Sequence, residues 1–150
     1  MEMHSRSEIV CSVLANSRTK STVYTVLDHY APTHKPLDGD YGCWDTPYNN
    51  PEYTFGSEDE MLEYYAENTA AVCSFYWNLG VGTPTRYVVV GARFTSDGQL
   101  VMSVIVDVEE EAEDECLDEL KMLLNSQIGV ISYVNPAYFT DGQDFADRYG

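Results

Sequence analysis

Apolar and polar positions alternate with different periods along the chain, and these periods predict a series of short elements. The segment Thr22–Leu27 is β-branched and aromatic, which predicts a strand. The stretch 28–56 holds most of the prolines of the chain and predicts a long loop after this strand. A loop of this length inside a compact domain often carries function. Residues 8–15 fit either a short helix or an additional strand.

A helix is predicted over Ser57–Leu79. Ser57 and Glu60 have the spacing of a capping box, in which two side chains satisfy free backbone amides of the first turn. The apolar residues that follow recur at helical spacing, and Gly80 marks the end of the helix.

A β-hairpin is the strongest local signal in the chain. Tyr87–Phe94 and Leu100–Asp107 are nearly continuous apolar strands, and the short turn between them contains Asp97-Gly98. Strands that are apolar on both faces lie in the centre of a sheet, so we expect both of these to be central strands.

The last third of the chain predicts a helix, a strand and a tail. Glu109–Asn125 carries an apolar stripe with helical spacing, and Ile128–Val134 has the composition of a strand. The tail after Asn135 contains four aromatic residues, which we expect to pack back onto the domain: Tyr138, Phe139, Phe145 and Tyr149.

The order of these elements predicts an α+β fold. A strand, a long loop, a helix, a hairpin, a helix and a strand give the βαββαβ order of a ferredoxin-like sandwich, with two helices on one face of an antiparallel sheet. A length of 150 residues fits a single domain. We expect residues 1–20 and 135–150 to lie at its periphery.

The chain is strongly acidic, with 25 acidic residues against 8 basic ones and a net charge of −17 at pH 7. A small domain needs a net charge of only about 2–8 for solubility, so the excess calls for a cause. Direct nucleic-acid binding and docking on an anionic membrane are both disfavoured, because both rely on lysine and arginine.

The ends and the cysteines predict a cytoplasmic protein. The N-terminus lacks the features of a signal peptide, and no apolar run is long enough to span a membrane. The four cysteines are widely spaced and form no CxxC pair, so we expect reduced and mostly buried thiols rather than a zinc site or disulfides.

Acidic residues are concentrated at the start of the helix predicted over Glu109–Asn125. On a helical wheel, the face opposite the apolar stripe carries Glu111, Asp114, Glu115 and Asp118. Like charges at this spacing repel each other, and Lys121 is the only base in the helix. The cluster is either a solvated face or a surface shaped for a basic partner.

Aromatic residues are concentrated in the long loop, where Tyr41, Trp44 and Tyr48 lie close to Asp45 in the sequence. Tyrosine and tryptophan anchor many protein interfaces, because they bury a large area at a small entropic cost. This group either closes the loop over the core or anchors a partner.

No cofactor, metal site or catalytic group is predicted. The histidines match no established zinc spacing, and the aspartates at 38–45 lack the glutamate that would complete a calcium loop. Serine, cysteine and histidine do not occur in a recognised nucleophile motif.

The helix over Ser57–Leu79, the hairpin around Ser96–Leu100 and the acidic helix after it resemble, in order and character, the immunity proteins of bacterial polymorphic toxin systems. The resemblance implies a small cytoplasmic α+β protein that inhibits a cognate toxin by occluding its site. We therefore expect a binding protein that neutralises a basic protein partner.

Three alternatives remain at this point. A phage-type nucleic-acid mimic, acting against restriction or CRISPR enzymes, would also be small and acidic. A salt-loving host would explain the charge, although it would spread the acids evenly over the surface. A small enzyme of unknown type is the third alternative.

Overall fold

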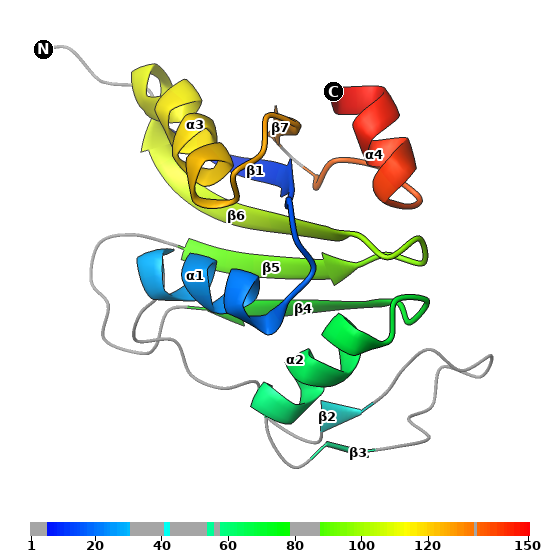
Figure 1. Ribbon diagram of the computed structural model, residues 1–150. Helices are drawn as coiled ribbons and strands as arrows, with labels where there is room; N and C mark the ends of the chain where they lie inside the picture. Colours follow the sequence, from blue (N-terminus) through cyan, green and yellow to red (C-terminus); the bar gives the residue numbers. More distant parts are fainter. Residues whose placement is uncertain (1–5, 31–40, 43–53, 56–57, 79–87, 134) are drawn as a thin grey trace, which may run out of the picture.

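The computed structural model describes residues 6–30, 41–42, 54–55, 58–78, 88–133 and 135–150. They form an α+β fold around a five-stranded antiparallel sheet with the strand order β4-β5-β6-β1-β7 (Figure 1). The strands of this sheet are β1 Arg6–Leu14, β4 Cys73–Asn78, β5 Val88–Phe94, β6 Leu100–Glu109 and β7 Gly129–Ser132. The helices are α1 Lys20–Tyr30, α2 Glu58–Glu67, the 3-10 turn η1 Glu110–Ala112, α3 Glu113–Leu123 and α4 Gly142–Tyr149. A second, two-stranded sheet joins β2 Tyr41–Gly42 to β3 Thr54–Phe55.

The helices divide between the two faces of the sheet. Helices α1, α2 and α3 cover one face, where their apolar residues join those of β1, β4, β5 and β6 in the main core. Helix α4 and the chain before it cover one end of the opposite face, with a second cluster formed by Leu14, Val101, Phe139 and Phe145. The tail therefore packs back onto the domain, as its aromatic content predicts.

The α+β class, the antiparallel sheet and the central hairpin of β5 and β6 are confirmed. The βαββαβ order and the pair of helices on one face are wrong. The described chain runs β1, α1, β2, β3, α2, β4, β5, β6, η1, α3, β7, α4, with three α-helices on one face and α4 on the other.

The predicted strand Thr22–Leu27 is part of helix α1. Its buried residues are Val23, Val26 and Leu27, which share one face of a helix. Burial of this apolar face outweighs the β-propensity of the branched residues, because propensity is a weak preference that tertiary packing overrides.

The predicted helix Ser57–Leu79 ends at Glu67, and Cys73–Asn78 forms strand β4. The side chain of Asn68 donates to the carbonyl of Tyr64 and closes the helix. Phe75 and Trp77 are buried whereas Tyr76 is exposed, so burial alternates with the period of two that a strand requires. The apolar residues of this segment also recur at helical spacing, which is why the sequence predicts a longer helix.

Residues 8–15, which fit either a helix or a strand, lie mostly within β1. This strand lies between β6 and β7, although it belongs to the N-terminal segment that we expect at the periphery.

The predicted acidic helix and the predicted strand after it are both present. Helix α3 begins only at Glu113, and β7 covers Gly129–Ser132.

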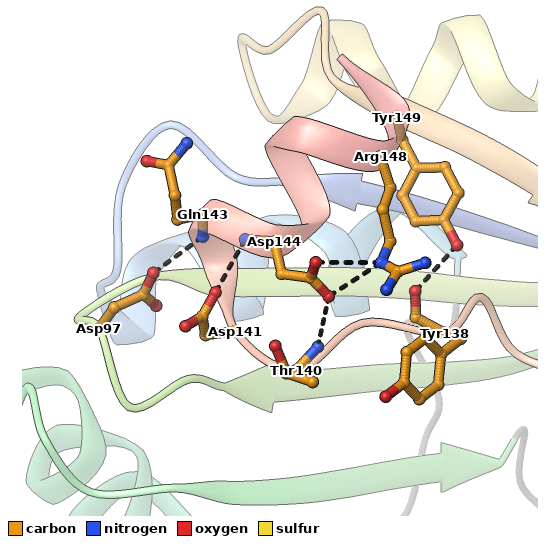
Figure 2. Close-up of polar contacts among 8 residues, drawn as sticks. All are labelled: Asp97, Tyr138, Thr140, Asp141, Gln143, Asp144, Arg148 and Tyr149. Atoms are coloured by element: carbon orange, nitrogen blue, oxygen red, sulfur yellow. Dashed lines mark hydrogen bonds and ion pairs between the residues drawn. The ribbon is translucent and has the colours of Figure 1, made fainter.

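Asp97, in the hairpin turn, connects the sheet to helix α4 (Figure 2). Its carboxylate accepts hydrogen bonds from the backbone amides of Gly142 at 2.9 Å and Gln143 at 2.8 Å. Asp141 caps the same helix by accepting from the amide of Asp144 at 2.8 Å. Two carboxylates thus satisfy amides that the first turn of α4 leaves free.

Replacing Asp97 by asparagine is expected to lower the free energy of unfolding by about 1 kcal/mol at neutral pH, the typical loss for a helix cap. Burial alone would raise the pKa of Asp97, but bonds from Thr95, Gly142 and Gln143 together hold it below its usual value. A depressed pKa gives stability above the unfolded value of about 3.9, and this stability is lost as pH falls through the folded pKa.

The measurement is urea unfolding of wild type and Asp97→Asn at neutral pH and at about pH 3. The difference between the two proteins should shrink at the lower pH. A difference that stays constant with pH would contradict the role of the carboxylate charge.

Candidate interaction surface

Helix α3 and the η1 turn before it expose a row of acidic side chains. All four acids predicted to face solvent are exposed: Glu111, Asp114, Glu115 and Asp118. Glu110 and Glu119 are also exposed. We call the α3 surface the set Glu110, Glu111, Asp114, Glu115 and Asp118.

The inner face of α3 fixes the direction of these acids. Leu120 and Leu124 are buried in the main core, while Cys116 and Leu117 pack against it. The helix ends where Asn125 adopts the left-handed conformation, with φ 51°. Because the inner residues are held by packing, the acids on the other side are held toward solvent.

Glu113 is the exception on this helix, since it is buried with 7% of its surface exposed. Its carboxylate is hydrogen-bonded to the hydroxyl of Tyr133, and this bond is the main reason that the pKa of Tyr133 is raised. Sequence reasoning missed this residue. The signal was present, because Glu113 has the same spacing as Leu117, Leu120 and Leu124 on the inner face.

Glu119 also differs from the other acids, because its carboxylate contacts side chains of α1. Its Oε1 lies 3.0 Å from Nε2 of His29. Burial, followed by a hydrogen bond to Glu119, raises the pKa of the Tyr30 hydroxyl well above its usual range. Glu119 therefore connects α3 to α1 and does not belong to the α3 surface.

Three basic residues of the described chain have partners away from α3. Lys20 pairs with Asp59 at 3.0 Å, Arg148 pairs with Asp144 at 3.0 Å, and Arg93 lies over the ring of Phe139. Among the described residues, no lysine or arginine forms an ion pair with Asp114, Glu115 or Asp118. The carboxylates of Asp114, Glu115 and Asp118 are therefore open to a cationic group of another molecule.

Two exposed apolar residues border the α3 surface. Tyr133, at the end of β7, is 58% exposed, and the charges of Asp114 and Glu110 contribute to its raised pKa. Met122, in the last turn of α3, is 82% exposed. An aromatic ring among exposed carboxylates offers both a charge and a flat apolar contact to a cationic side chain.

Tyr41, the one described member of the aromatic group predicted in the long loop, lies apart from these acids. The backbone of Tyr41 belongs to β2, which pairs with β3 and lies near α2, whereas α3 covers the β1 and β7 side of the sheet (Figure 1). Trp44, Asp45 and Tyr48 lie outside the described residues. The structure thus brings the four predicted acids together and places Tyr41 apart from them.

The described cysteines, Cys11, Cys73 and Cys116, form no disulfide with one another. Cys11 is buried, and Cys73 and Cys116 are half-buried. Burial, with smaller contributions from Cys116 and Glu113, raises the pKa of Cys11 to about 12. A thiol that stays protonated is a poor nucleophile, so Cys11 acts as a core residue.

The described residues show neither a metal cluster nor a membrane-spanning helix, and they line one open hollow. Within the described residues, no group of three or more histidine, cysteine or acidic side chains is arranged to hold a metal ion. No described helix has the length and apolar character needed to cross a membrane. An open hollow of about 470 Å³ lies at the end of α2, where Tyr64 and Glu67 are its only titratable lining residues.

No protein-family model, curated protein sequence or solved structure matches this chain.

Proposed function

We propose that the protein is an acidic binding protein that neutralises a basic protein partner, and that this partner is a cognate bacterial toxin whose site it occludes. Under this proposal the α3 surface meets the positive surface of the partner. Toxins that act on nucleic acids need such a surface, because phosphate binding depends on lysine and arginine.

The observation that carries the proposal is the uncompensated charge of three carboxylates on the α3 surface. Asp114, Glu115 and Asp118 are exposed, and no described lysine or arginine pairs with them. Like charges at helical spacing destabilise the helix by a few tenths of a kcal/mol per pair. This cost is explained if the same charges speed association with an oppositely charged partner.

The extent of the surface favours protein binding over mimicry of duplex DNA. From Glu111 to Asp118 the helix rises only about 10 Å. Duplex DNA presents one charge per about 1.7 Å over a much longer distance. A compact patch fits a local contact with one basic protein.

Affinity capture from lysate of the source organism, at low and at high salt with mass spectrometry, tests the proposal. We expect one basic protein to be retained at both salt concentrations, because a desolvated interface resists screening. Many basic proteins that are all lost at high salt would show that the charge is only a nonspecific field.

A further inference from the structure

Strand β7 forms one edge of the five-stranded sheet, and β1 is its one partner among the described strands. The amide of Leu14 donates to the carbonyl of Ile128 at 2.9 Å, just outside the ladder. In an antiparallel pair, residues point their backbone groups alternately toward and away from the partner strand. Val130 and Ser132 therefore face β1, whereas the backbone groups of Gly129 and Ile131 face outward.

These outward groups have no hydrogen-bond partner among the described residues. The strand is short, but Gly129–Ser132 contains neither of two common protective features of an edge, a charged residue or a proline. Its side chains are held on both faces of the sheet, because Ile131 packs against the main core and Val130 against the second cluster. A fixed strand with an open backbone edge is a template for a further strand.

The surroundings of this edge define what can pair with it. Tyr133 follows β7 directly, and its hydroxyl is hydrogen-bonded to Glu113 with Asp114 and Glu110 nearby. One end of the edge therefore lies beside the α3 surface. A second copy of the chain would bring two such acidic surfaces together, which like charges oppose. An extended segment that places lysine or arginine side chains at the Tyr133 end of the edge is complementary, whereas Lys121 lies beside Gly129 at the other end.

We propose that the outer edge of β7 binds an extended, basic segment of the partner as a sixth strand. The segment forms backbone hydrogen bonds with Gly129 and Ile131, and its basic side chains meet Glu110 and Asp114. The inference rests on the proposed function and adds the form in which the partner is recognised.

The test uses the full chain, labelled with ¹⁵N, and a peptide of alternating lysine and valine about eight residues long. Amide exchange is measured at each residue. At about ten times Kd, the outward amides of Gly129 and Ile131 should exchange roughly tenfold more slowly. The inward amides of Val130 and Ser132 should change less, because β1 already protects them. The same peptide with every backbone nitrogen methylated carries the same charge, but it has no N–H to donate and its methyl groups block strand pairing, so it should protect none of them.

A pair of variants at Tyr133 separates the backbone from the ring. Tyr133 has the same phase as Ile131, so Tyr133→Pro removes an outward amide, whereas Tyr133→Ala removes only the ring. The lysine-valine peptide should bind Tyr133→Pro several-fold more weakly than it binds Tyr133→Ala. Equal affinities would overturn the proposal.

The remaining outcomes separate this inference from the proposed function. Equal binding of both peptides at the α3 surface, with unchanged exchange in β7, would overturn the sixth strand and leave the proposed function standing. Exchange in β7 that slows with the concentration of the free protein would assign the edge to a second copy. No response from either peptide at α3 or β7 would count against both proposals.

Discussion

Replacing Arg18 by alanine should lower the free energy of unfolding by about 3 kcal/mol. The Arg18 guanidinium donates to five backbone carbonyls at 2.7–3.1 Å, which belong to Tyr65, Asn68, Ala71, Thr95 and Gln99. It also lies 5.0 Å from the ring centroid of Phe94. One side chain thus connects the end of α2, the start of β4 and the hairpin turn. Its removal leaves several half-buried carbonyls without a donor.

Thermal unfolding measures this loss, and the midpoint should fall by roughly 6–12 °C for a chain of this size. Arg18→Lys keeps the charge but not the planar set of donors, so it should recover less than half of the loss. Lys20→Ala is the control, because Lys20 forms only exposed ion pairs and should leave the midpoint nearly unchanged. Similar midpoints for Arg18→Ala and Lys20→Ala would show that the carbonyl contacts contribute little.

The double variant Asp114→Lys and Asp118→Lys should slow association with the captured partner by about 10–100-fold at low salt. Both residues are exposed on the α3 surface, and their reversal changes the sign of the local field without touching the core. The rate should also depend less on salt, while dissociation changes little. Stopped-flow or surface-binding kinetics over a range of salt concentrations measures both rates.

The double variant Glu67→Lys and Asp147→Lys is a matched control for the change in net charge. These residues are exposed on α2 and α4, and the change in net charge is the same. If net charge alone attracts the partner, the two double variants will slow association equally. If the α3 surface directs the partner, only the first will do so.

The sequence predicts the α+β class and the face of α3 because both depend on local patterns. The hairpin is marked by Asp97-Gly98, and Gly98 has the positive φ of 80° that such a turn requires. The spacing of Cys116 and Leu120 is enough to predict that the acidic residues on the opposite side of the helix face solvent.

The remaining features depend on contacts between distant residues. Thr22–Leu27 has the composition of a strand and becomes a helix, because Val23, Val26 and Leu27 bury one face against the sheet. Arg18 has no local signal, since its carbonyl partners lie 47 to 81 residues away. The open edge of β7 depends on the strand order, which no single segment determines.

The most direct test of the central claim is to repeat the affinity capture with three baits: wild type, the α3 double variant and the matched control. The account predicts that wild type and the control retain the same basic protein at low and at high salt. The Asp114→Lys and Asp118→Lys bait should lose most of it. Equal retention by all three baits would contradict the assignment of the α3 surface as the binding site.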